Sequence, residues 1–259
     1  MAEVLTCAVE RGIATVALAR PAVRNAFNAE LIAALRATFD ELSERADVRA
    51  VVLAGEGPVF CGGADVGWMR AALDLSYDEN VADAEAMSDM FRSIDRCARP
   101  VVARVQGAAL GGGAGLVAVC DVAIASADAT FGFTEVKLGI IPAVISPFVL
   151  AKIGASHARA LFVTGRRFDA AHAREIGLVH AVVPEPSLDA AVDGVLDELR
   201  TAAPTAVRAI KALVADVLGA SYDASRGLTS SAIAKQRTSE EGQEGLRAFL
   251  ERRPAAFVE

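Results

Sequence analysis

Two glycine-rich segments carry the most specific chemical signal in the sequence. They are residues 61–64 (Cys-Gly-Gly-Ala) and 111–113 (Gly-Gly-Gly), and each follows an apolar run typical of a β-strand. Glycine leaves bare backbone that another group can approach closely, and a helix that begins there presents unpaired N–H groups. Two such N–H groups directed at one oxygen form an oxyanion hole, which stabilises charge on a carbonyl oxygen.

Glu135 is the first candidate for an acid or base beside these segments. It lies among Phe133, Val136 and Leu138, just before residues 139–142 (Gly-Ile-Ile-Pro). A carboxyl group in apolar surroundings has a raised pKa and can exchange protons near neutral pH. The alternative is a surface glutamate paired with Lys137, and the local sequence leaves both interpretations open.

Other catalytic classes lack the residues that they need. The three histidines, His157, His172 and His180, have no partner at metal-ligand spacing. The sequence holds no Gly-x-Ser-x-Gly elbow and no Gly-x4-Gly-Lys-Ser/Thr loop. The four cysteines are scattered, so we expect reduced and mostly buried thiols without a metal.

A dinucleotide site is the rival interpretation of the second glycine segment. Residues 113–118 fit a degenerate Gly-x-Gly-x-x-Ala pattern, and an acid, Glu135, follows Gly115 at the usual distance of about 20 residues. In that fold the acid ends the next strand. Here the next strand is expected to end near Ser126, and the helix before it is too short for an ordinary crossover. These lengths disfavour the dinucleotide interpretation.

Composition bounds the class of protein. The chain has 259 residues, of which 53% are apolar, and a net charge of −7. This length allows one large domain, or a core with a smaller appendage. The acidic balance without a basic cluster argues against a nucleic-acid partner, and also against an anionic membrane. We expect no signal peptide, because no basic region followed by an apolar core begins the sequence. We also expect no membrane span and a cytoplasmic location, because the longest uncharged run, residues 105–120, is short and glycine-rich.

The elements that position the glycine segments alternate between strand and helix, which predicts an α/β domain with mainly parallel strands. A helix after Asn28, its expected N-cap, has apolar residues at helical spacing. Residues 66–80 show no clear period and predict a loop. Met87 and Met90, in the helix after it, are expected to fill the core. The expected elements are strands at 4–8, 13–18, 48–53, 101–105, 122–125 and 178–183, and helices at 29–45, 81–97, 116–120, 144–153, 156–164, 170–176, 188–199 and 204–219.

The last third of the chain is predicted to be helical. Ser187 is the expected N-cap of the helix at 188–199, and Pro204 the start of the next. Residues 220–259 continue as helix, so this region is either a small separate domain or an assembly surface.

Together, these motifs resemble the crotonase superfamily of enoyl-CoA hydratases and isomerases over nearly the whole chain. The resemblance is specific for the superfamily and much less so for the reaction. The matching stretches are residues 20–28, 60–65, 107–113, 120–121, 131–142, 161–165, 173–179 and 244–249.

The resemblance implies a spiral of β-β-α turns, followed by a C-terminal helical region that builds trimers, commonly paired into hexamers. We expect the spiral core with the active site at residues 1–200, and the oligomer contacts at residues 201–259. The implied substrate is an acyl-CoA thioester, and no metal or redox cofactor is implied.

The resemblance also assigns roles by position. Gly62 and Gly112 take the two oxyanion-hole N–H positions, and Glu135 matches the second catalytic glutamate of the hydratases. A further group matches the part of the site that binds CoA or the substrate, with its last two members expected to reach the CoA of a neighbouring subunit: Ala22, Arg24, Gly63, Ala64, Asp65, Phe249 and Arg252.

One departure from the family pattern limits the functional prediction. Typical hydratases carry a first glutamate where this chain has Gly115. Three hypotheses follow: a hydratase that uses Glu135 alone, a Δ3,Δ2-enoyl-CoA isomerase with Glu135 as its single proton carrier, and a non-catalytic acyl-CoA binder. The first is favoured because Gly115, together with residues 134–147, looks like the methylglutaconyl-CoA hydratase branch of leucine and isoprenoid breakdown.

Overall fold

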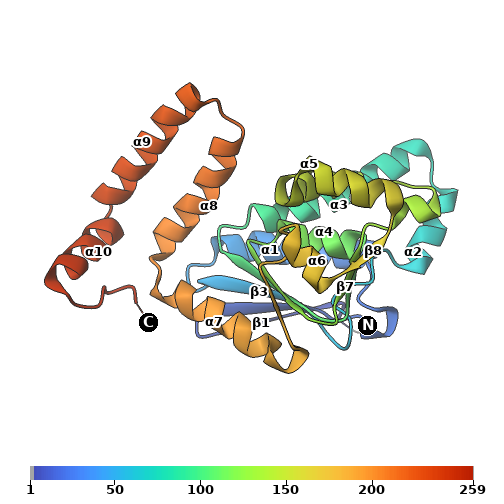
Figure 1. Cartoon of the computed structure of the whole chain (residues 1–259), viewed down its shortest axis with the longest axis horizontal. Coiled ribbons are helices and arrows are strands. Elements are labelled where there is room, and N and C mark those ends of the chain that lie inside the picture. The colour runs from blue at the N-terminus through green and yellow to red at the C-terminus, as the bar shows by residue number, and fades with distance from the viewer. Residues whose placement is uncertain (1–2, 259) are drawn as a thin grey trace.

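A six-stranded sheet forms the centre of the molecule in the computed structural model, which describes residues 3–258 (Figure 1). Its first two strands form an antiparallel hairpin, and all other neighbours in this sheet are parallel. In sheet order the strands are β1 (Leu5–Glu10), β2 (Ile13–Leu18), β3 (Ala50–Gly55), β4 (Val101–Val105), β6 (Val122–Ser126) and β9 (Ala181–Val183). The prediction of an α/β fold with mainly parallel strands is confirmed.

The crossover helices bury one apolar face against this sheet. In α1 (Ala29–Glu44), Leu31, Leu35, Phe39 and Leu42 are buried at helical spacing. As predicted, Asn28 caps this helix, because its side-chain oxygen accepts a hydrogen bond from the Leu31 N–H at 2.9 Å.

Residues 66–80 are mostly helical, so the predicted loop is wrong. They contain α2 (Val66–Ala71), a 3₁₀ turn (Ala72–Asp74) and the start of α3 (Tyr77–Asp95). Two caps explain the difference. The Asp65 carboxylate accepts from the N–H groups of Gly67 and Trp68, and Ser76 and Glu79 form a reciprocal capping box.

A second, three-stranded sheet brings the two expected catalytic segments together. In it β7 (Thr130–Gly132) pairs in parallel with β5 (Ala108–Leu110) and antiparallel with β8 (Arg167–Asp169). Leu110 lies opposite Gly132, and the Gly111 N–H donates to the Gly132 carbonyl oxygen at 2.8 Å. The glycine triplet and the segment that leads to Glu135 therefore emerge side by side.

Two apolar clusters cover the two faces of the large sheet. Figure 1 shows α1, α3, α4 and α5 on one side and α7 on the other. The larger cluster holds buried phenylalanines such as Phe27, Phe91 and Phe131. The smaller one packs Leu188, Val192 and Leu196 of α7 against the sheet. The remaining helices of the core are α4 (Gly112–Val119), α5 (Ser146–Thr164), α6 (Ala170–Glu175) and α7 (Leu188–Thr201).

One predicted helix break is confirmed, and one predicted helix cap is confirmed in part. Gly154 interrupts α5 with a φ of 73°, which agrees with two helical segments separated near residue 154. Ser187 is the N-cap of α7, but its side chain accepts no capping hydrogen bond, so only the position of that cap is confirmed.

Within the described residues, no helix has the length and apolar character needed to cross a membrane.

Three C-terminal helices extend from the core as an arm: α8 (Pro204–Leu218), α9 (Tyr222–Thr238) and α10 (Glu240–Glu251) (Figure 1). Of their residues only Ala248 is buried. The arm is tied to the core by Lys211, whose Nζ lies 2.7 Å from Asp121 Oδ2. The expected division at residue 200 stays a prediction, although it coincides with the base of this arm.

Arg49 makes the other attachment. Its guanidinium donates to the carbonyl oxygens of Arg200 and Ala202, at the link from α7 to α8, each at 2.9 Å. It also donates to the carbonyl oxygen of Phe257 at 2.9 Å, so one side chain holds both ends of the arm.

Arg49→Met should therefore lower the free energy of unfolding by roughly 2–4 kcal/mol, because it removes several charge-assisted hydrogen bonds. Chemical denaturation measures this change. The matched control is Arg36→Met, since Arg36 is half exposed and pairs with Asp89 at the surface. It should cost no more than about 1 kcal/mol. Equal effects of both variants would contradict the role of Arg49.

Candidate active site

A cavity of about 400 Å³ opens where the two catalytic segments meet. Its walls come from the first glycine turn, the start of α4, the segment around Glu135, and the helices α2 and α3. The lining residues are Gly62, Gly63, Ala64, Trp68, Met69, Ala84, Met87, Leu110, Gly111, Gly112, Thr134, Glu135, Leu138 and Ile140 to Ile145. Glu135 is the only ionisable residue in this lining.

The first glycine turn is held between two neighbouring segments by backbone hydrogen bonds. On one side, the Phe27 N–H donates to the Gly63 carbonyl oxygen at 2.7 Å, and the Asp65 N–H donates to the Phe27 carbonyl oxygen at 2.9 Å. On the other side, Cys61 pairs with Ala109. Phe27 thus bonds to the two neighbours of Ala64, as in a parallel β-bridge. In such a bridge, the middle residue of the three points its own N–H away from the partner segment. The Ala64 N–H is therefore directed away from Phe27, toward the side of β5.

Gly62 does not have the expected role. Its N–H donates to the Arg24 carbonyl oxygen at 2.7 Å, so this donor is already occupied. The prediction that the Gly62 N–H belongs to the oxyanion hole is therefore wrong. Ala64, two residues later, has the suitable orientation. The residue-by-residue match had placed it in the CoA-binding group, and only the hydrogen-bond pattern distinguishes the two positions.

Gly112 fits its expected role. It begins α4, and the first hydrogen bond of that turn runs from the Gly115 N–H to the Gly111 carbonyl oxygen at 3.1 Å. The N–H of Gly112 precedes this bond and has no acceptor within the helix. A Cβ at Gly112 would lie 2.9 Å from the Phe27 ring and 3.0 Å from Met87 Cε, so only glycine fits.

Glu135 lies against the glycine triplet and is not a surface ion pair. Its Oε1 is 3.2 Å from the position that a Cβ at Gly111 would occupy, so the bare backbone makes room for the carboxylate. Its Oε2 is buried, and no donor from the described residues reaches it. Burial raises the pKa of Glu135 above the ordinary value for a glutamate. The group therefore has the setting of an acid/base catalyst.

Gly115 leaves no space for a second carboxylate. A Cβ at this position would lie 2.4 Å from Ile145 Cγ2 and 3.1 Å from Phe91 Cε1. Both neighbours are buried, so a larger side chain at residue 115 requires Ile145 to move.

The other predicted binding residues have mixed positions. Gly63 and Ala64 line the cavity, whereas Asp65 caps α2 and pairs with Arg20 at 3.0 Å. The remaining four do not line the cavity: Ala22 and Arg24 are exposed near the first turn, and Phe249 and Arg252 lie in or beside α10 at the far end of the molecule (Figure 1). Within one chain the structure does not bring Phe249 or Arg252 to the cavity.

Sequence reasoning missed much of the cavity wall. Trp68 and Met69 come from the segment without a clear period, and Ala84 comes from the helix predicted after it. Met87 lines the cavity although it was expected in the core. Met90 is fully buried, as predicted.

Of the four cysteines three are buried, and burial raises the pKa of Cys61 to about 12. No group of three potential metal ligands occurs among residues 3–258.

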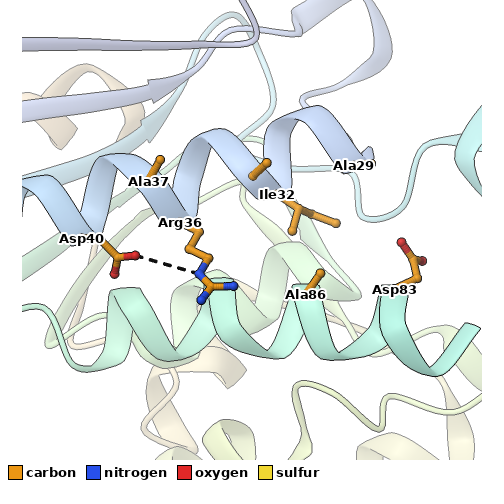
Figure 2. A pocket seen from close by; sticks show the side chains of 8 residues that line it. Ala29, Ile32, Arg36, Ala37, Asp40, Asp83 and Ala86 are labelled. Carbon is orange, nitrogen blue, oxygen red and sulfur yellow. Dashed lines mark ion pairs between the residues drawn. The ribbon is translucent and has the colours of Figure 1, made fainter. Parts of the chain in front are cut away.

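A second hollow, of about 300 Å³, lies between α1 and α3 (Figure 2). Small residues such as Ala29 and Ala37 line it, and its cation, Arg36, pairs with Asp40 and Asp89 at 3.9 and 2.8 Å. This hollow has no buried acid and no convergent backbone donors, so the cavity at Glu135 is the better candidate for the active site.

The fold and the site define an α/β protein in which backbone N–H groups and one buried carboxylate share a cavity. A family model described as enoyl-CoA hydratase/isomerase matches residues 8–259. A putative enoyl-CoA hydratase of Thermus thermophilus is 34% identical over 96% of this chain and 99% of its own length. The chain therefore belongs to the enoyl-CoA hydratase/isomerase family.

Solved structures agree with this assignment. The chain is similar to an enoyl-CoA hydratase from Shewanella pealeana, with 36% identity, a TM-score of 0.94, and coverage of 98% of this chain and 96% of that one. It is also similar to Pseudomonas aeruginosa AtuE, with 35% identity, a TM-score of 0.96, and coverage of 99% and 100%. The predicted crotonase fold is confirmed.

The raised pKa of Glu135 has a consequence for stability. A carboxyl group whose pKa is raised by folding favours the folded state only while it is protonated, and this contribution is lost as the pH rises through the raised pKa. Glu135→Gln should therefore be more stable than the wild type at pH 7, and the difference should shrink below the ordinary pKa of glutamate.

Denaturation at several pH values measures this difference. Glu85→Gln is a suitable control, because it makes the same chemical change at an exposed position of α3. A Glu135→Gln variant that is less stable than the wild type at pH 7 would refute the burial of an unpaired carboxylate.

Proposed function

We propose that this protein is an enoyl-CoA hydratase, which adds water across the 2,3 double bond of an acyl-CoA thioester. The observation that carries the proposal is the Glu135 carboxyl group, buried against Gly111 at the N-terminus of α4. Family membership supports the same reaction class, because several relatives bear the name enoyl-CoA hydratase.

In the proposed reaction, the N–H groups of Ala64 and Gly112 bind the thioester oxygen. The oxygen of a water molecule bonds to C3, and the π electrons of the double bond move through C2 to the thioester oxygen, giving an enolate. The two N–H groups stabilise that charge, and each such donor typically changes the rate by about 10²- to 10³-fold.

Glu135 would handle both proton transfers. As a carboxylate it takes a proton from the attacking water, and as the acid it returns a proton to C2, so the addition is balanced. The raised pKa of Glu135 suits this double use, because an acid/base group works best when its pKa is near the operating pH. The reaction as proposed uses no metal ion and no redox cofactor.

A Δ3,Δ2-enoyl-CoA isomerase is the second candidate. The observation that favours it is the packing of Ile145 and Phe91 against Gly115, which leaves Glu135 as the only ionisable residue in the cavity lining. Isomerisation moves one proton between C4 and C2 and needs no second group to hold water. The non-catalytic acyl-CoA binder remains as the outcome in which neither reaction occurs.

The acyl group is the finer part of the proposal. Residues 134–147 together with Gly115 resemble the methylglutaconyl-CoA hydratase branch, so 3-methylglutaconyl-CoA is the first branched substrate to test. A role in leucine breakdown depends on this choice of substrate and is proposed with it. The cytoplasmic location expected from the sequence stays a separate proposal.

We also propose that copies of the chain assemble into trimers or hexamers through α8–α10. The support is the apolar surface that the arm exposes, which includes Ile210, Val214, Leu218 and Leu250. Exposed apolar surface of this kind typically marks an interface. In such an assembly Phe249 and Arg252 could approach the CoA bound by a neighbouring copy.

Glu135→Gln should lower the turnover number by about 10²- to 10⁴-fold, because the amide cannot exchange protons. The affinity for a saturated acyl-CoA ester should remain, since the backbone N–H groups are unchanged. Turnover is followed by the loss of enoyl absorbance with crotonyl-CoA and 3-methylglutaconyl-CoA, and by the gain of this absorbance with a 3-enoyl-CoA. A fully active variant would remove Glu135 from the mechanism.

The same assays on the wild type separate the candidates. Hydration of either conjugated ester supports the hydratase, whereas conversion of the 3-enoyl ester alone favours the isomerase. Calorimetric binding without any turnover would favour the non-catalytic binder.

Sedimentation should find a trimer or hexamer at micromolar concentration, and the paired change Leu218→Glu and Leu250→Glu should dissociate it. Both side chains are 78% exposed in the single chain, so charge there opposes association without disturbing the core. Leu73→Glu is the matched control, because Leu73 is 84% exposed but lies outside the arm. A monomeric wild type would contradict the proposed assembly.

A further inference from the structure

The Ile145 side chain occupies the space that a side chain at residue 115 would need. The ideal Cβ of residue 115 would lie 2.4 Å from Ile145 Cγ2 and 3.1 Å from Ile145 Cβ. Real Cβ atoms do not approach other atoms this closely, so the Ile145 side chain fills the volume that other residue types at 115 would use. Ile145 is 2% exposed and also lines the catalytic cavity.

The position of Ile145 relative to Glu135 follows from α4. Glu135 lies against Gly111, and Ile145 lies against Gly115, which is four residues further along. The hydrogen bond from the Gly115 N–H to the Gly111 carbonyl oxygen closes one helical turn between them. Residues four apart lie on the same face of a helix, about 5–6 Å from each other. Ile145 is therefore about one turn from the carboxylate along the cavity wall.

This distance assigns Ile145 to a particular part of a bound substrate. If Glu135 exchanges protons at C2 and at the water on C3, a group one turn further along meets the acyl chain just beyond the double bond. Phe91 borders the same space, because it is fully buried and its Cε1 would lie 3.1 Å from a Cβ at Gly115.

We propose that Ile145 is a specificity-determining residue, which with Gly115 and Phe91 limits the group that follows C3 to a methyl group or an unbranched chain and disfavours a branch at C4. This inference rests on the proposed function, because it uses the position of the reacting carbons. Gly115 contributes to this limit because it has no side chain, which lets Ile145 line this part of the cavity wall.

The test compares crotonyl-CoA with 4-methylpent-2-enoyl-CoA, which is branched at C4. Ile145→Ala should raise the ratio of kcat/KM for the branched ester to kcat/KM for crotonyl-CoA by roughly 10- to 100-fold, the usual effect of one or a few methylene groups in a pocket. The control is Ile153→Ala, because Ile153 is a buried residue of α5 that does not line the cavity. It should lower the melting temperature and leave the ratio unchanged.

Shared space also predicts a coupling between the two positions. Gly115→Ala should lower the melting temperature or prevent folding, and Gly115→Ala combined with Ile145→Ala should recover much of that loss. Independent, additive effects of the two changes would show that they do not compete for one volume, and would overturn the proposal.

Binding of saturated esters separates this inference from the proposed function. If no enoyl ester is converted, the hydratase proposal fails, but the affinities of butyryl-CoA and 4-methylpentanoyl-CoA can still be measured by calorimetry. Ile145→Ala should then shift their ratio toward the branched ester. An unchanged ratio in a folded Ile145→Ala variant, in kinetics or in binding, would overturn the role of Ile145.

Discussion

The double anchoring of the first glycine turn is the interaction on which the rest of the site depends. Backbone hydrogen bonds tie Gly63 and Asp65 to Phe27 on one side, and tie Cys61 to β5 on the other. These bonds fix which N–H groups are used within the protein and which are left for a ligand. Because they are made by main-chain atoms, the geometry depends little on side-chain identity. The direction of the Ala64 N–H is therefore set by backbone pairing.

A buried carboxylate is costly for the fold and useful for chemistry. Glu135 lies against Gly111 with one oxygen buried, and its raised pKa reflects water that the site excludes. A donor placed at Oε2 would stabilise the anion but would also lower the pKa and hold the proton-accepting atom. The unpaired oxygen thus agrees with a stability cost that is retained for function.

Sequence reasoning identified the features that local patterns encode. The period of Leu31, Leu35 and Phe39 and the cap at Asn28 predicted α1, and the position of Glu135 beside the glycine triplet followed from the motifs. It failed where the outcome depends on distant atoms. Whether the N–H of Gly62 or of Ala64 is available depends on Arg24 and Phe27, which are about 40 residues away in the chain. The helix α2 and the first turn of α3 were missed because they begin at side-chain caps instead of an apolar period.

The hydrogen bonds of Arg49 determine when, during synthesis, the C-terminal arm can reach its final position. One guanidinium binds the carbonyl oxygens of Arg200 and Ala202 and that of Phe257, more than 50 residues later. During synthesis the core and α7 leave the ribosome well before Phe257 does. The arm is therefore not locked in its final orientation while translation continues. Surfaces that require this orientation form only after Phe257 has been released.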